Sequence, residues 1–151
     1  MSAQAQAAIA ALGEGALSAQ ATATAALLYD LLPAPLVVAA LPGGGVVLHG
    51  GDPVLCVARI TGAGLRLGPA RLRFWGRRAV LVEASTARLT WSQLSADATA
   101  LTALLAPLVQ AAVAQRRAEL LPCGRCGCPR AAEEVAIIAA TSGPCPCCAH
   151  A

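Results

Sequence analysis

The segment Arg71-Leu72-Arg73-Phe74-Trp75-Gly76-Arg77-Arg78-Ala79-Val80-Leu81-Val82-Glu83-Ala84 carries the clearest strand signal in the chain. In its first half polar and apolar residues alternate, so Arg71 and Arg73 share one face of a strand and Leu72 and Phe74 share the other. Gly76-Arg77 suits a hairpin loop that leads into a second strand, residues 79–84. The segment therefore predicts an antiparallel pair with one buried face and one arginine-bearing face.

Short apolar runs continue this pattern on both sides, and glycine- and proline-rich turns separate them. Gly68-Pro69 is expected to break the chain just before the central pair. Cys56 falls on the strand face opposite Arg59, which predicts a small buried hydrophobe rather than a reactive thiol. The sequence thus predicts an antiparallel β-meander, with further strands at residues 36–41, 46–49, 54–60, 65–67 and 88–91.

The residues before the meander are expected to be helical. Gly13-Glu14-Gly15 interrupts an alanine-rich stretch, and Ser2 and Ser18 are candidate N-caps for the helices on either side. Such helices have good propensity but little to bury, so they need a partner surface. The apolar stripe that would face it consists of Leu27, Leu28, Leu31 and Leu32.

A long helix is expected after the meander, beginning at Ser95 with Asp97 in its first turn. Pro107 lies inside the helical pattern and is expected to kink or divide it. Arg116 and Arg117 lie near the C-terminal end, where the helix dipole favours cations. The stripe expected to pack on the sheet is Leu101, Leu104, Leu105, Leu108 and Ala112.

These elements predict an α+β protein of N-terminal helices, an antiparallel β-meander, a long C-terminal helix and a small Cys-rich metal-binding tail. The expected divisions are an N-terminal helical segment (1–33), an α+β domain (34–121) and the Cys-rich tail (122–151). A chain of 151 residues suits one compact domain with a small appendage.

The tail holds six of the seven cysteines in the chain. Two Cys-x-x-Cys pairs, Cys123/Cys126 and Cys145/Cys148, are separated by 18 residues, a spacing typical of four-cysteine zinc sites. Each pair can offer two thiolates from a tight turn, and two such turns complete a tetrahedron around one ion. Cys128, Cys147 and His150 are substitute ligands for the same site.

This arrangement resembles a zinc ribbon or a pair of zinc knuckles, and the resemblance covers only the tail. An iron–sulfur cluster would also take four cysteine thiolates. Disulfides are the third alternative, but they require an oxidising compartment. No positively charged, leucine-rich leader is visible at the N-terminus, which favours a cytoplasmic protein and a metal.

The chain contains neither lysine nor asparagine, so arginine is its sole strongly basic residue type. Abundant Ala, Gly, Pro and Arg indicate a GC-rich genome, such as that of a high-GC bacterium or of a virus infecting one. The arginines nevertheless concentrate in residues 59–88, where seven oppose Glu83 alone. They form either an ordinary solvated sheet face or a candidate surface for an acidic protein partner or for nucleic acid, comprising Arg59, Arg66, Arg71, Arg73, Arg77, Arg78 and Arg88.

The sequence contains few residue patterns that are typical of catalytic sites. His49 and Asp52 could assist a nucleophile, but no serine- or cysteine-centred motif accompanies them. The glycine-rich turns match neither a P-loop nor a dinucleotide fingerprint. The apolar runs are too short for a membrane span. The favoured interpretation is therefore a non-catalytic structural or adaptor subunit that binds other protein subunits or further copies of itself, for example a virion or phage-tail component assembled in the cytoplasm. The alternatives are a zinc-ribbon nucleic-acid-binding or regulatory protein and an iron–sulfur redox protein.

Overall fold

The computed structural model describes residues 3–12, 17–75, 78–84, 87–94, 96–123 and 126–130. They confirm the α+β class, with helices α1 (Ala3–Ala10), α2 (Ala19–Leu31) and α3 (Ala98–Glu119) and a 3-10 turn at Trp91–Gln93. The strands are β1 (Leu36–Ala40), β2 (Val46–Gly50), β3 (Cys56–Thr61), β4 (Gly64–Trp75), β5 (Arg78–Glu83), β6 (Ala87–Leu89), β7 (Leu121–Pro122) and β8 (Pro129–Arg130).

The main sheet is an antiparallel meander in the order β1-β2-β3-β4-β5, and β6 also pairs with β4. Strand β4 is shared by three neighbours. Its first half pairs with β3 on one side and β6 on the other, and its second half pairs with β5. The predicted meander is confirmed, and β4 is the strand that joins its parts.

The predicted break at Gly68-Pro69 is wrong, because β4 continues through it for 12 residues. The hydrogen bond from Ala70 N–H to the Leu55 carbonyl shows that even-numbered residues of β4 bond to β3. Pro69 is odd-numbered, so the N–H that proline lacks would face away from β3. On that side the strand paired with β4 changes from β6 to β5. There the Pro69 carbonyl still accepts a hydrogen bond from Ala84 N–H, so the proline costs the β3 ladder nothing.

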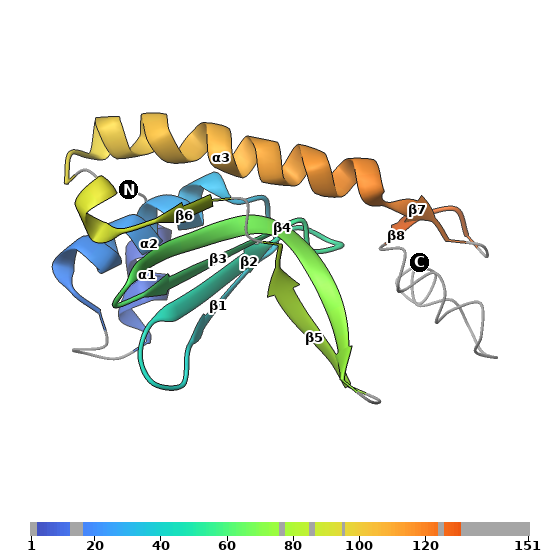
Figure 1. The fold of residues 1–151 in the computed structure, drawn as a ribbon, viewed down its shortest axis with the longest axis horizontal. Coiled ribbons are helices and arrows are strands. Elements are labelled where there is room, and N and C mark those ends of the chain that lie inside the picture. Colours follow the sequence, from blue (N-terminus) through green and yellow to red (C-terminus); the bar gives the residue numbers. More distant parts are fainter. Residues whose placement is uncertain are drawn as a thin grey trace.

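All three helices lie on one side of the sheet, with α3 running across it (Figure 1). α3 packs on β4 and β3, and α2 on β2 and β3. Residues of α1, such as Ile9, belong to the same buried cluster as the sheet residues. The N-terminal helices therefore find their partner surface on the sheet and on α3, in a cluster that includes Leu28, Leu48, Ile60, Leu65, Leu67 and Leu105.

The helix caps follow the predicted chemistry with small shifts. The Ser18 hydroxyl accepts a hydrogen bond from Ala21 N–H at the start of α2, which confirms that cap. Ser2 and Ser95 lie outside the described residues. Asp97 is the N-cap of α3 and accepts from Ala100 N–H, so the helix begins at Ala98 rather than at Ser95.

Pro107 lies within a single helix of 22 residues and does not divide it. The ring is exposed to solvent, and so is Ala103, whose carbonyl loses its usual partner. Water can satisfy that carbonyl on the outer side of the helix, which explains why the helix continues. By length and hydropathy α3 is the one helix in the described part that could cross a membrane; 22% of its apolar stretch is buried, and Leu101, Leu105 and Val109 lie in the core.

We expect Pro107→Ala to raise the free energy of unfolding by about 1–3 kcal/mol, because it restores a helical N–H and removes a ring clash. Urea titration followed by circular dichroism measures the change. Ala111→Pro, at another exposed position of α3, is the matched control and should lower stability by a similar amount. No effect of Pro107→Ala would mean that the helix is not continuous there.

Candidate functional site

The first cysteine pair of the tail lies at the turn of a small hairpin that follows α3 directly. Leu120 caps the helix, and β7 then pairs antiparallel with β8 in the register Leu121↔Arg130 and Pro122↔Pro129. The long helix therefore ends in the cysteine hairpin, which extends beyond the sheet (Figure 1). A single residue, Leu120, separates the helix from β7, so the hairpin follows α3 without an intervening linker.

Backbone hydrogen bonds define the turn. Cys123 N–H donates to the Cys128 carbonyl over 2.8 Å, and Gly127 N–H donates to the Cys123 carbonyl over 2.9 Å. Gly127 has φ = +78°, a left-handed conformation that favours glycine. The side chain of Cys123 is buried, Cys126 is half-buried and Cys128 is exposed. The hairpin thus fixes the two candidate ligands on one turn and leaves a third thiol beside them.

The remaining candidate ligands, Cys145, Cys147, Cys148 and His150, lie outside the described residues. Among the residues that are described, no group of three or more His, Cys, Asp or Glu side chains has the arrangement of a metal site. The described part therefore holds the first half of the predicted four-cysteine set, and Cys123 and Cys126 are the members whose local geometry is defined.

A cavity of about 780 Å³ lies between the hairpin, the end of α3 and the loop before β3. Its apolar lining includes Leu55, Leu120 and Pro129, and Asp52, Arg117 and Arg130 supply charges of both signs. Sequence reasoning did not find this cavity, because its walls come from three segments that are distant in the chain. The exposed thiol of Cys128 also lines it.

The predicted arginine surface is divided in the structure. Arg59 and Arg66 are opposite each other on β3 and β4, and Arg88 is opposite Arg66 on β6, so these three form one row. The row lies on the side of the sheet away from the helices, because the neighbouring side chains of Ile60 and Leu65 enter the helix-covered core. Arg77 lies outside the described residues, and only the backbone of Arg78 is described.

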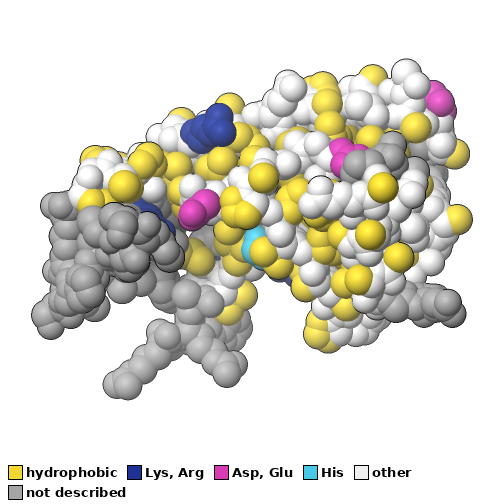
Figure 2. All heavy atoms as spheres, turned by 180° about the vertical axis from the view of Figure 1, so that it is seen from behind, with side chains coloured by type: hydrophobic (Ala, Val, Ile, Leu, Met, Phe, Trp, Pro, Cys, Tyr) yellow, Lys and Arg dark blue, Asp and Glu magenta, His cyan; other side chains and the backbone are white. Residues whose placement is uncertain are grey.

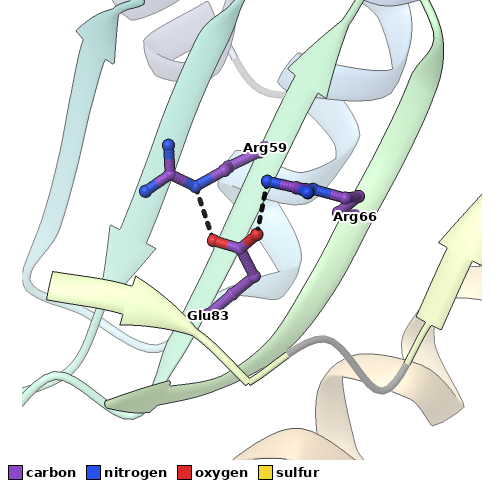
Figure 3. A network of polar contacts seen from close by, with 3 residues as sticks. All are labelled: Arg59, Arg66 and Glu83. Atoms are coloured by element: carbon purple, nitrogen blue, oxygen red, sulfur yellow. Dashed lines mark hydrogen bonds and ion pairs between the residues drawn. The ribbon is translucent and has the colours of Figure 1, made fainter. Parts of the chain in front are cut away.

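Glu83 neutralises part of this row. Its carboxylate accepts from Arg59 Nε and lies 2.8 Å from a terminal nitrogen of Arg66 (Figure 3). The Glu83 side chain is only 5% exposed, whereas that of Arg66 is 47% exposed. Sequence reasoning counted Glu83 as one opposing charge, and its position at the centre of an arginine pair follows only from the register Ala70↔Glu83.

Arg71 lies on the other side of the sheet, so the prediction that all these arginines share one face is wrong. Its guanidinium pairs with Glu119 near the end of α3, and the nearly buried Arg116 lies 3.8 Å from the same carboxylate. Arg73 is two residues further along β4, on the same face as Arg71, and is exposed. Arg71 therefore ties the helix that carries the cysteine hairpin to the sheet.

The two other candidates for chemistry have simple environments. His49 is half-buried in β2, between Val37 and Val57 in the sheet register, and burial lowers its pKa. Burial raises the pKa of the Cys56 thiol to about 12, which keeps it protonated and unreactive at neutral pH. The prediction of Cys56 as a small buried hydrophobe is confirmed by its place in the core cluster.

Charged side chains are also sparse over much of the surface. Figure 2 shows the molecule from behind, where apolar and uncharged side chains prevail and the charged ones are separated from one another. The charged residues amount to 13% of the chain.

No family model matches this chain, and no match was found among curated proteins or solved structures.

Glu83→Gln should lower the free energy of unfolding by about 2–3 kcal/mol, because it removes a buried charge that two guanidiniums require. Arg66→Gln is the control: half of that side chain is in water, so its loss should cost less than about 1 kcal/mol. Chemical denaturation of both variants tests this expectation. Equal small losses would show that the Glu83 cluster contributes little.

His49 should make stability depend on pH. Since burial lowers its pKa below 6.5, the unfolded chain binds a proton more readily than the folded one. The stabilising contribution is therefore present above pH 6.5 and is lost as the pH falls through the folded-state pKa. We expect His49→Gln to flatten the profile of melting temperature between about pH 5 and 7. An unchanged profile would assign the pH dependence to other groups.

Proposed function

We propose that this protein is a non-catalytic structural or adaptor subunit of a larger assembly, with a C-terminal tail that zinc stabilises. The observation that carries the proposal is the hairpin that places Cys123 and Cys126 on one hydrogen-bonded turn. Paired thiolates on such turns are the ligand set of closed structural zinc sites. A zinc ion there would supply folding free energy to a segment with few large apolar side chains.

The proposed ligands are Cys123, Cys126, Cys145 and Cys148, with Cys128, Cys147 and His150 as substitutes. Cys128 is exposed beside the pair and is the nearest substitute within the described hairpin. The direct connection of hairpin and helix supports an adaptor role, since α3 would present the metal-bound tail in a fixed direction. The Arg71–Glu119 ion pair supports the same direction from the sheet side.

Partner binding by protein subunits, rather than by nucleic acid, is favoured by the charge distribution. Glu83 occupies the space between Arg59 and Arg66 and reduces the positive charge that this row offers to phosphates. The specific assembly that we propose is a virion or phage tail from a high-GC host, put together in the cytoplasm.

Nucleic-acid binding is the second candidate, and the exposed arginines favour it. Arg66 and Arg88 are adjacent in the sheet register, and Arg73 lies on the other face of β4; all three are exposed. A zinc-ribbon regulatory protein would bind DNA or RNA with an affinity that falls steeply with salt. An iron–sulfur redox protein would use the same thiolates and would absorb visible light.

Elemental analysis of anaerobically purified protein should give about one zinc per chain, as expected for one four-thiolate site. Replacing Cys126, Cys128, Cys147 and Cys148 together by Ser, which removes the substitutes as well, should abolish the zinc, and Cys56→Ala, which removes the buried core thiol, should leave it unchanged. Iron with visible absorbance would favour the redox alternative. The absence of both zinc and iron would overturn the proposal. Gel-filtration mass and salt-dependent nucleic-acid binding then separate the adaptor from the regulatory role.

Chelation provides a second test of the same site. Loss of zinc should make the chain protease-sensitive from about Pro122 onward, while the sheet and α3 keep their melting transition, because the main core does not include the hairpin. Melting of the whole protein in one step would show that the tail and the main core fold as one unit.

A further inference from the structure

Strand β1 forms one open edge of the main sheet. It pairs with β2 on one side, and no strand within the described part of the chain pairs with the other. Natural proteins usually protect such an edge with a charged side chain, a proline or a bulge, since unpaired backbone groups there can bind another strand. The sequence of β1, Leu36-Val37-Val38-Ala39-Ala40, contains none of these protections.

The hydrogen-bond pattern identifies the residues that face outward. At the two ends of the β1–β2 pair, Gly51 N–H donates to the Pro35 carbonyl and Leu41 N–H donates to the Gly45 carbonyl. Bonded pairs alternate in an antiparallel ladder, so odd-numbered residues of β1 bond to β2. Leu36, Val38 and Ala40 consequently direct their N–H and carbonyl groups to the open edge.

We infer that β1 pairs antiparallel with β1 of a second copy of this chain, about a two-fold axis at Val38. In this register Val38 faces Val38 of the other copy and Leu36 faces its Ala40, so every outward backbone group gains a partner. The side chains also suit each other, because large and small residues meet on both faces. Leu36 lies opposite Ala40 on the helix-covered face, and Val37 lies opposite Ala39 on the other.

Electrostatics favours a second copy over a charged peptide. A two-fold axis brings identical side chains close together, so charges near it would repel. Neither β1 nor β2 contains Asp, Glu, Lys or Arg. The edge therefore accepts its own copy without repulsion and offers a charged partner nothing to attract it.

The flanking prolines limit the pairing without opposing it. Pro35 is an odd-numbered position that faces β2, so its missing N–H is not needed at the edge. Pro42 follows the strand where the chain turns, with Gly44 N–H bonded to the Leu41 carbonyl. Pairing is thus confined to the five residues of β1, which makes the predicted interface smaller than a standard one of about 800 Å² per partner.

The opposite edge of the sheet is less suited to this role. β5 contains Arg78 and Glu83, and the Glu83 carboxylate is already engaged by Arg59 and Arg66. Its exposed Val80 is nevertheless a close match for Val37, since the relative exposure of the residue is 45% for Val80 and 47% for Val37. The two valines therefore provide matched sites for testing which edge associates.

The experiment is sedimentation of the full metal-loaded chain over a range of about 1 μM to 1 mM, since a small interface implies a dissociation constant of the order of 10⁻⁵ M or weaker. Val37→Lys places two ammonium groups near the axis and should weaken dimerisation at least about tenfold. Ala40→Pro removes an outward N–H without touching the β2 ladder and should have a similar effect. Val80→Lys should dimerise like the parent protein.

Amide hydrogen exchange gives a residue-specific readout of the same event. On association the N–H groups of Leu36, Val38 and Ala40 should gain protection, while those of Val37 and Ala39 are protected in both states. A chain that stays monomeric at about 1 mM would overturn the inference, and so would dimerisation that survives Val37→Lys. Loss of association in Val80→Lys alone would overturn it too, by placing the contact at β5.

The inference stands on the sheet and does not need the metal. A dimer that forms equally before and after chelation would support it even if the zinc proposal failed. If Ala40→Pro fails to fold, Val37→Lys still tests the pairing of β1, because Val37 is exposed and its replacement should not disturb the core. The circular dichroism spectrum of the Val37→Lys variant reports whether the fold is kept.

Discussion

The alternation of side chains along β4 is the constraint on which the rest of the structure depends. Its 12 residues run without interruption, so between Leu65 and Arg73 the odd-numbered side chains lie on the helix-covered face and the even-numbered ones on the other. Leu65 and Leu67 thereby enter the core, and Arg71 reaches Glu119 on α3. Arg66, with the opposite parity, meets Glu83 on the far side. One strand thus decides both how the long helix is anchored and on which face of the sheet each of its arginines lies.

The sequence predicted the class, the meander and the packing stripe of α3, because these follow from local periodicity and from turn residues. The predicted break at Gly68-Pro69 was wrong, because β4 continues through these two residues although both usually interrupt strands. Proline is costly only where its N–H is needed, and that depends on which neighbour strand lies on which side. The error had a second consequence: with β4 divided, the parity of Arg66 and that of Arg71 could not be compared, so the arginines were assigned to one face.

For the cysteine hairpin the local pattern was informative and the long-range contacts were not predictable. The cysteine spacing predicts a turn that offers two thiolates, and the hairpin around Gly127 has that turn. The sequence could not indicate how firmly this turn is attached, since attachment depends on contacts between distant residues. Arg71 joins β4 to Glu119, and Arg116 adds a second, nearly buried cation to the same carboxylate. The last turn of α3 is therefore fixed just before the chain enters the cysteine hairpin.

The proposed assembly subunit would need surfaces that bind partners, and the β1 edge and the cysteine hairpin after α3 would meet that need differently. At β1 the recognition groups are backbone amides, whose geometry is fixed by the ladder to β2 and whose specificity comes from the absence of charge. At the end of α3 they would be side chains ordered by a bound ion. Backbone pairing tolerates sequence change on the exposed face, whereas thiolate coordination does not. Substitutions at Val37 and Ala39 that keep the strand neutral should therefore preserve self-association, while a change at Cys123 or Cys126 would remove the tail as a binding element.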